Sequence, residues 1–418
     1  MNKRDILELK RRFKKTDATF TKVCGCYVNS EKHVIVTLDE IFLNLDDEEL
    51  HKYLEIAKKT LSGSLGNNLL ELDFPLEEEG VDGKQQFLLG LRDSNLKNEE
   101  LLQRFYEHVI DTYQYLGNYL ILLFHDAYDV ITKTNDNMNI DESEEVYQYL
   151  LCAICPVSLS KPGLGYREDE NRIGARIRDW IVGVPDVGFV FPAFTERSSD
   201  IHSLMYYTKN TKEPDEAFME FGLGCPSKPT ATQQKVTFQE VVKKTVGADE
   251  QLGEQVLFEL QQNLKDMVTY KEEMEGKNAD PILLTPSTIQ TALEDSQLSN
   301  EVIEKVELAL GNTFAGEPPI AELLIDEKSL AAHEQKAKEQ SLIKEVHSLK
   351  EKLTETTAQI EEEQKEYESV VKTYDVILKV KPDKVSQIKS QTIDGQKCLV
   401  IPMEEDEFAN VNGVTTKI

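Results

Sequence analysis

Apolar side chains recur at three- and four-residue spacing in the first quarter of the chain, and this spacing predicts amphipathic helices. In the first helix, Ile6, Leu7, Leu9 and Phe13 fall roughly on one face, while basic residues occupy the rest of the surface. The second begins at the acidic run 46–49, where the helix dipole favours negative charge, and it stops before Gly63. The expected helices cover residues 2–15, 46–61 and 98–116.

Short apolar runs bounded by turn residues predict a sheet in the same part of the chain. Two β-rich runs, 23–28 and 33–38, flank the polar stretch 29–32, which is the pattern of a hairpin. Helices do not alternate strictly with the strands, so we expect an α+β domain with a mainly antiparallel or mixed sheet. The further expected strands cover residues 119–124, 146–154, 176–182, 188–191 and 204–208.

The periodicity becomes helical after the proline-containing stretch 225–230, which predicts a domain boundary there. The helices expected beyond it cover residues 236–246, 249–274, 287–295 and 299–310. β-prone runs return at 376–380, 384–393 and 397–401, and Asp394-Gly395 between the last two is a strong hairpin signal. The predicted organisation is an α+β domain (1–228), a helical domain (229–326), a long charged helix or coiled coil (327–375) and a small β unit (376–418).

A heptad repeat can be laid over residues 328–374. One core position is apolar or aromatic throughout, and it is occupied by Val346, Leu353, Ile360, Tyr367 and Tyr374. The other is only half apolar, with Leu349, Thr356, Glu363 and Val370. Two interpretations stay open: a coiled coil that pairs two chains or clasps a protein partner, and a solvated helix or helical hairpin that packs on its own protein.

Charge and composition limit the kinds of partner that the protein can be expected to bind. The formal net charge is −29 over 418 residues, so the surface as a whole repels the phosphates of nucleic acid. The longest apolar run, 119–124, is far too short to cross a bilayer, and the first residues lack the apolar core of an export signal. We therefore expect a cytoplasmic protein of two or three folding units, with no membrane segment and with its six cysteines as free thiols.

Two cysteine pairs are candidate metal ligands, since four thiolates in two close pairs can hold zinc. They are Cys24 with Cys26, and Cys152 with Cys155. The second pair lies in an apolar strand whose alternation would send its thiols to opposite faces, and small buried thiols commonly serve in packing. The sequence favours buried core cysteines and no cofactor.

Acidic and histidine side chains at strand ends and in loops form a candidate catalytic cluster, because acid–base and metal groups often sit at such positions. The candidates are His125, Asp126, Asp129, Asp200 and His202, with Arg197 nearby in the sequence. Together they would suit a metal-dependent hydrolase or nuclease. The alternative is that they make turn and cap hydrogen bonds.

The first helix carries most of the basic residues of an otherwise acidic sequence. Residues 1–22 hold eight Lys or Arg against three acids, a local charge of +5 that leaves −34 elsewhere. The cations that could contact nucleic acid or an acidic partner are Lys3, Arg4, Lys10, Arg11, Arg12, Lys14 and Lys15. The alternative, which we favour, is that this helix docks on its own protein.

Neither glycine-containing stretch fits a catalytic motif. Residues 163–165 lack the frame of a phosphate-binding loop and are expected to form a turn. Residues 62–66 lack the glycine order of a nucleophile elbow and are expected to end a helix.

Several stretches of the sequence are distinctive, among them CGCYV, AKKTLSGSLGNNLLEL, LLCAICPVSLSKPGLGY and IDGQKCLVIP. With these stretches the sequence resembles, over nearly the whole chain, an uncharacterised family of Gram-positive bacterial proteins of unknown function. It implies no activity, cofactor or site residue. A fainter likeness, over residues 205–207 and 218–225, is to bacterial nucleoid-associated proteins.

The sequence thus favours a non-enzymatic cytoplasmic interaction or scaffold protein. The alternatives are a nucleoid-associated or nucleic-acid-handling protein that uses the basic helix, and the hydrolase or nuclease.

Overall fold

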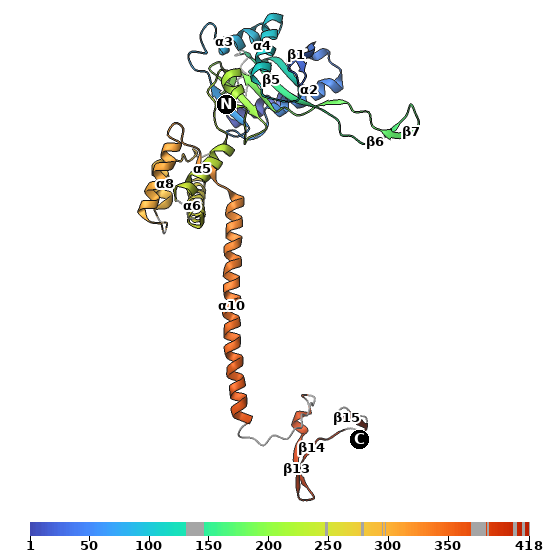
Figure 1. The fold of residues 1–418 in the computed structure, drawn as a ribbon, viewed down its shortest axis with the longest axis vertical. Helices are drawn as coiled ribbons and strands as arrows, with labels where there is room; N and C mark the ends of the chain where they lie inside the picture. The colour runs from blue at the N-terminus through green and yellow to red at the C-terminus, as the bar shows by residue number, and fades with distance from the viewer. Residues whose placement is uncertain are drawn as a thin grey trace, which may run out of the picture. The chain divides into compact units, whose positions relative to one another are not determined.

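The computed structural model describes residues 1–130, 146–246, 250–276, 280–294, 296, 298–368, 382, 384–403, 408–411 and 414–417. The chain forms two compact units, Met1–His333 and Glu334–Ile418. The first unit contains the large sheet and a group of helices, and the second contains most of one long helix and small hairpins (Figure 1).

Local sequence explains the N-terminal elements. Asn2 caps the first helix in a capping box with Asp5, and Asp46 accepts hydrogen bonds from the first backbone N–H groups of the second. The three helices and the hairpin expected here are confirmed, whereas α3, a ten-residue helix with a glycine in its last turns, was not expected. The elements are α1 (Lys3–Arg12), β1 (Phe20–Val28), β2 (Val34–Ile41), α2 (Asp47–Thr60), β3 (Leu69–Asp73), α3 (Lys84–Asp93) and α4 (Glu99–Thr112).

The strands of the sheet all pair antiparallel, which agrees with the expected mainly antiparallel or mixed sheet. Its strand order is β2-β1-β4-β5-β9-β12-β3, and β8 pairs with the end of β5. A side chain on Gly25 would overlap the carbonyl oxygen of Ile121, so β1 can approach β4 this closely only with glycine there. The remaining strands of the sheet are β4 (Asn118–Asp129), β5 (Val146–Leu159), β8 (Trp180–Val182), β9 (Val187–Phe191) and β12 (Ser203–Thr208).

The segment between β5 and β9 departs from expectation. Only Trp180–Val182 of the strand expected over 176–182 pairs with the sheet. The turn expected at 163–165 is instead the start of a two-stranded ribbon, β6 (Leu164–Arg167) with β7 (Arg172–Ala175), which reaches away from the sheet in Figure 1. Leu164 and Ile173 on this ribbon are exposed, so hydrophobic burial does not fix it. Two short strands, β10 (Ala193–Thr195) and β11 (Ser198–Asp200), pair with each other.

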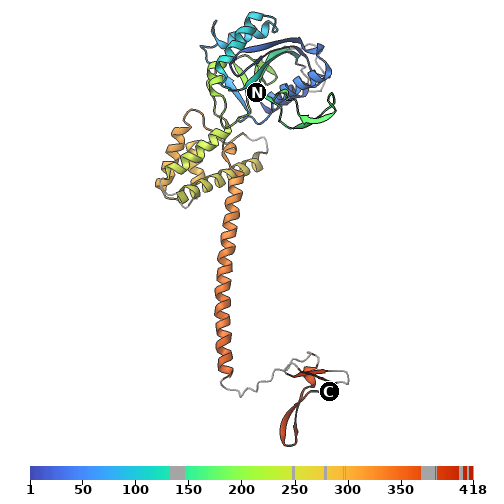
Figure 2. The same cartoon turned by 45° about the vertical axis from the view of Figure 1, so that its right-hand side comes forward.

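Helices cover both faces of the sheet (Figures 1 and 2). Ile121 and Leu123 of β4 face a core shared with α3 and α4, while Leu122 and Phe124 face a second core shared with α1 and α2. Burial on both faces accounts for the uninterrupted apolar run of this strand.

Five helices continue the first unit and enclose a third core that includes Phe238, Leu260 and Leu310. The N-terminus of the first of these helices is fastened to the sheet region, because Ala231 N–H donates to the Gly66 carbonyl (2.7 Å). The helical character expected beyond residue 230 is confirmed. The helices are α5 (Ala231–Thr245), α6 (Glu250–Glu275), α7 (Pro286–Leu293), α8 (Asn300–Thr313) and α9 (Ala321–Leu324).

The longest helix, α10 (Glu327–Glu368), begins in the first unit and continues in the second. The hairpin expected around Asp394-Gly395 is confirmed as β13 (Lys389–Ile393) paired with β14 (Gln396–Val400), and both turn residues have positive φ. A second hairpin joins β15 (Phe408–Val411) to β16 (Val414–Lys417). The strand expected over 376–380 lies outside the described residues. No described helix combines the length and apolar character that a membrane-crossing helix needs.

Candidate functional site

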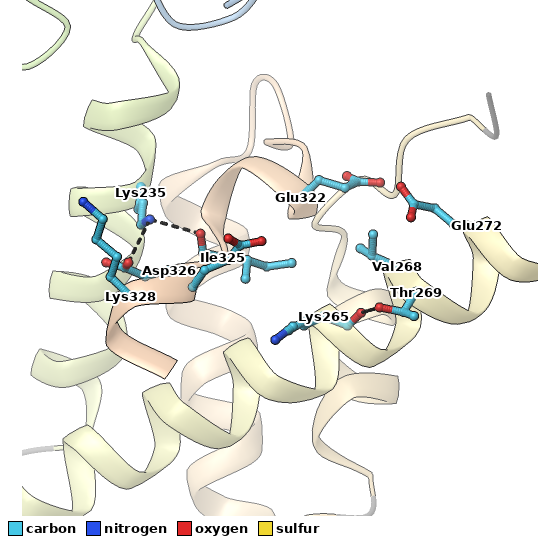
Figure 3. Close-up of a pocket in the computed structure, with 10 residues that line it drawn as sticks. Lys235, Lys265, Val268, Thr269, Glu272, Glu322, Ile325, Asp326 and Lys328 are labelled. Atoms are coloured by element: carbon cyan, nitrogen blue, oxygen red, sulfur yellow. Dashed lines mark hydrogen bonds and ion pairs between the residues drawn. The ribbon is translucent and has the colours of Figure 1, made fainter. Parts of the chain in front are cut away.

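The start of α10 is anchored to the helices of the first unit. The Lys235 ammonium of α5 forms an ion pair with Asp326 (3.5 Å) and donates to the Ile325 carbonyl (3.0 Å), as Figure 3 shows. Asp326 in turn accepts from the Ser329 N–H at the first turn of α10. Burial acts to raise the pKa of Asp326, but the Ser329 N–H and the Lys235 charge outweigh it and hold the pKa below its usual value. The carboxylate therefore joins α5 to the N-terminus of α10 in its charged form.

An open cavity of about 630 Å³ lies beside this anchor, between α5, α6 and the start of α10 (Figure 3). Lysine and acidic side chains share its wall, so neither sign of charge dominates. Its charged residues are Lys235, Lys265, Lys328, Glu272, Glu322, Asp326 and Glu327.

Apolar contacts complete the anchor. Leu330 is buried, and the His333 ring stacks on Phe258 of α6 with 4.3 Å between ring centroids. Beyond Leu330, every α10 residue up to Thr357 whose exposure is described is exposed. The first turns of α10 are thus packed against the other helices of the first unit, whereas the residues that follow are exposed to solvent.

The solvated part of α10 carries an apolar stripe, which we define as Leu342, Val346, Leu349 and Leu353. These side chains follow one another at four-, three- and four-residue steps, so they lie on one side of the helix. Between 50% and 68% of each side chain is exposed, and Ile343 beside them is exposed to 61%. Large exposed apolar patches are often contact sites in proteins, so the stripe is a candidate contact site.

The candidate catalytic residues His125 and Asp126 lie on opposite faces of the sheet, because side chains alternate along β4. Nδ1 of the buried His125 lies 2.7 Å from the Thr21 hydroxyl oxygen, and its Nε2 finds no hydrogen-bond partner among the described residues. Burial lowers the pKa of His125 to about 4. Asp126 accepts a hydrogen bond from Tyr149 (2.7 Å) in the other core, and burial raises its pKa.

The other candidates lie elsewhere. Asp200 accepts from the Ser203 hydroxyl (2.8 Å) and from the His202 N–H (3.1 Å), which is a local turn. His202 forms an exposed ion pair with Glu79 (2.7 Å), which raises the pKa of His202. His202 directly precedes β12, which is three positions from β4 in the strand order, a separation of about 14 Å at the usual strand spacing, and Asp200 ends β11.

Asp129 is exposed at the end of β4. The structure therefore does not bring the five candidates into one centre.

The cysteines are distributed in the same way between the faces of the sheet. Cys24, Cys26 and Cys152 lie in one core, and Cys155 lies in the other, as the alternation predicted. Burial raises the pKa of Cys24, Cys26 and Cys155 to about 12, which keeps these thiols protonated. Within the described part of the chain, no group of three or more His, Cys, Asp or Glu side chains is placed to hold a metal ion.

The basic helix α1 docks on the sheet. Leu9 and Phe13 are buried in the second core, and the Arg12 guanidinium lies 3.6 Å from the centre of the Tyr128 ring. Glu8 binds Arg197 (3.1 Å), and Lys15 forms an exposed ion pair with Asp47 (2.6 Å). Four other cations of this helix region remain exposed, and they are Lys3, Arg4, Arg11 and Lys14. Docking of α1 on its own protein is confirmed, and contact of the exposed cations with nucleic acid stays a prediction.

One polar cluster was not expected from the sequence. Lys84 Nζ lies 2.8 Å from His108 Nε2 in a cavity of about 250 Å³. Burial lowers the pKa of both groups. Residues 24 positions apart on different helices give no local signal of such a contact.

These features define an acidic α+β protein with an antiparallel sheet buried between helices and a long, exposed, striped helix. Residues 1–414 match the family described as domain of unknown function DUF4317, and the chain belongs to this family. The expected resemblance to a family of unknown function over nearly the full length is thus confirmed. The comparison with curated proteins found no match.

Proposed function

We propose that this protein is a non-enzymatic, self-associating scaffold in which α10 pairs with α10 of a second copy. The observation that carries the proposal is the exposed apolar stripe. Burial of a leucine or valine side chain contributes roughly 1.5–3 kcal/mol, so a helix that shields four of them gains a substantial driving force. Inside the compact part of Met1–His333, by contrast, the described polar side chains mostly serve packing, turns and caps.

A helix is the partner that fits the stripe. Steps of three and four residues form the seam of a coiled coil, in which each side chain enters a hole between four residues of the facing helix. The sequence continues the same frame with Thr356 and Ile360. Apart from Ile343, polar and charged residues occupy the positions away from the seam between residues 342 and 355, as expected for a helix that is solvated on its other sides.

Flanking charges support a parallel, in-register pair. In the frame that places Val346 at the first core position, Glu345 and Lys350 occupy the two positions that border the seam. In a parallel dimer, Glu345 of one helix faces Lys350 of the other, and the symmetric pair repeats the contact.

The proposal includes a cytoplasmic location for the protein. All six cysteines are free thiols, which supports a reducing compartment such as the cytoplasm.

Sedimentation of the full chain tests the proposal. We expect a dimer for the unaltered protein and a monomer at about 100 μM for Leu349→Glu with Leu353→Glu, because four charges would then meet in the seam. The matched control is Ser341→Glu with Ser348→Glu, which adds the same charge on another side of α10 and should leave the dimer intact. Equal sedimentation of the unaltered protein and the seam variant would refute the proposal.

A further inference from the structure

The side chain of Lys84 is positioned by the fold. Its backbone N–H donates to the Glu78 carboxylate (2.8 Å) at the start of α3. Gly224 has positive φ, and a side chain there would come within 2.7 Å of Lys84 Cγ, so the backbone of this loop packs directly on the lysine stem. The amine nitrogen Nζ then meets the His108 ring of α4, 2.8 Å from Nε2 and 3.4 Å from Nδ1. The amine is thus fixed beside an imidazole, unlike the amine of a surface lysine.

Lys84 lacks the carboxylate partner that normally stabilises a half-buried ammonium group. The Glu78 carboxylate is engaged by the backbone N–H, and Lys84 forms no ion pair in the part of the chain that the structure describes. Burial lowers the pKa of Lys84, and the charge of Arg104 acts in the same direction against the charge of Glu78. A larger share of Lys84 is therefore in the neutral, nucleophilic form than in an exposed lysine.

His108 supplies an acid–base group next to this amine. Its Nε2 lies 2.8 Å from the Gly222 carbonyl oxygen, and because a carbonyl only accepts, this contact assigns the imidazole hydrogen to Nε2. An ammonium group has no lone pair to offer that N–H, whereas a neutral amine has one, so the short distance between Nζ and Nε2 favours the neutral amine. Burial lowers the pKa of His108 and keeps the ring neutral as well.

The amine opens into a small cavity of about 250 Å³. Sites for drug-sized ligands measure roughly 300–1,000 Å³, so this one suits a molecule of a few atoms. Arg104 lines it, with its guanidinium carbon 5.3 Å from the centre of the Phe87 ring, and forms no ion pair among the described residues. The wall also carries three acidic side chains, which are Asp82, Glu107 and Asp111. They disfavour a ligand with more than one negative charge.

We propose that Lys84 is a covalent binding site for a small aldehyde or ketone that carries one carboxylate, with His108 as its proton donor and acceptor and Arg104 as the contact for the carboxylate. This site is independent of the proposed pairing of α10.

Imine formation is the step that these groups support. The Nζ lone pair attacks the carbonyl carbon and forms a C–N bond, while the carbonyl oxygen takes up a proton. The C–O bond of this adduct then breaks, and the oxygen leaves as water with the two protons that the nitrogen gives up. His108 relays these protons. Amine and carbonyl become imine and water, and no oxidant or reductant is consumed.

Trapping of the imine in the full chain tests the proposal. Glyoxylate is the probe, because it combines an aldehyde with one carboxylate, and cyanoborohydride supplies the hydride that reduces the imine to a stable secondary amine. Peptide mass spectrometry then compares Lys84 with Lys235, a half-buried lysine held by Asp326, and with the exposed Lys3. We expect Lys84 to be labelled at least about tenfold faster than either, since a positioned acid–base group commonly contributes about a hundredfold.

Two variants separate the roles of the neighbours. His108→Gln should slow labelling of Lys84 at least about tenfold with glyoxylate and with formaldehyde, because both need the proton transfer. Arg104→Gln should slow glyoxylate about two- to fivefold, the usual contribution of an exposed ion pair, and should leave formaldehyde unchanged because it has no carboxylate. Glu100→Gln, one turn earlier on α4 and outside the cavity, is the matched control and should change neither rate.

Labelling of Lys84 in the unaltered chain at the rate of Lys3 or more slowly would overturn the proposal. Equal loss with both aldehydes in Arg104→Gln would overturn the role of Arg104. Lys84→Arg, which keeps the stem and the charge, should abolish the label at this position with an unchanged melting temperature.

Discussion

Nδ1 of His125 and the hydroxyl oxygen of Thr21 lie 2.7 Å apart inside the sheet, and this contact holds a neutral imidazole in the core. Burial, with a smaller contribution from Arg92, lowers the pKa of His125 from 6.5 to about 4. The unfolded chain therefore binds a proton near pH 6.5, which the folded protein does not bind until about pH 4.

We predict that the stability contributed by neutral His125 is complete above pH 6.5 and is lost as the pH falls towards 4. The loss amounts to about 3 kcal/mol over this interval. Urea unfolding at a series of pH values measures it. His125→Leu should flatten the dependence between pH 6.5 and 4, whereas His202→Gln, at an exposed site, should not. An unchanged slope in His125→Leu would contradict the assignment.

Removal of the α10 anchor should loosen the first turns of that helix. Asp326→Ala deletes both the acceptor of the Ser329 N–H and the partner of Lys235, and loss of a helix cap typically costs about 1 kcal/mol. Hydrogen exchange at residues 329–333 should accelerate about fivefold for such a loss. Glu327→Ala, one residue further on and exposed, should have little effect. Equal exchange in both variants would show that Leu330 and the Phe258–His333 stack hold the first turns of α10 in place without the help of Asp326.

The parallel arrangement of α10 predicts which cysteines cross-link. In a chain whose half-buried Cys398 is replaced by serine, Leu353→Cys should form an intermolecular disulfide under mild oxidation, because equivalent seam positions face each other. Glu351→Cys, on the outer side of the helix, should cross-link far less. Non-reducing electrophoresis distinguishes the two, and efficient cross-linking at both positions would indicate collision instead of a fixed pair.

Nucleic acid should not bind under ordinary salt conditions. The net charge of −29 repels phosphates, and part of the basic helix is engaged by Tyr128 and Asp47. A gel shift with duplex DNA should show no retarded band at about 150 mM salt. A salt-sensitive band that disappears when Lys3, Arg4, Arg11 and Lys14 are replaced by alanine would instead support the nucleic-acid alternative.

Much of the fold could be predicted because its signals are local. The apolar spacing of Ile6, Leu9 and Phe13, the acidic start of α2 and the Asp394-Gly395 turn each act within a few residues of chain. The ribbon β6–β7 was not predicted, because its apolar side chains are exposed and follow no pattern of burial. The short helix α3 was not predicted either, and it lacks a side-chain cap that would mark its start.

The arrangement of the candidate catalytic residues could also be predicted only in part. A period of two already separates His125 from Asp126, so the sequence held the signal that these adjacent residues face apart. It held no signal for the two strands, β5 and β9, that lie between β4 and β12, because strand order depends on which distant segments pair.

By itself, the sequence determined the α+β class, the antiparallel hairpins and the spacing of the α10 stripe, since each follows from periodicity or turn residues along the chain, and it favoured the docking of the basic helix. Only the tertiary structure decided that the stripe side chains are exposed, that β2 and β3 are the edge strands of the sheet in the part of the chain that the structure describes, and that Lys84 contacts His108. The physical reason is that exposure and contact depend on which distant surfaces pack together, and no short stretch of sequence encodes that.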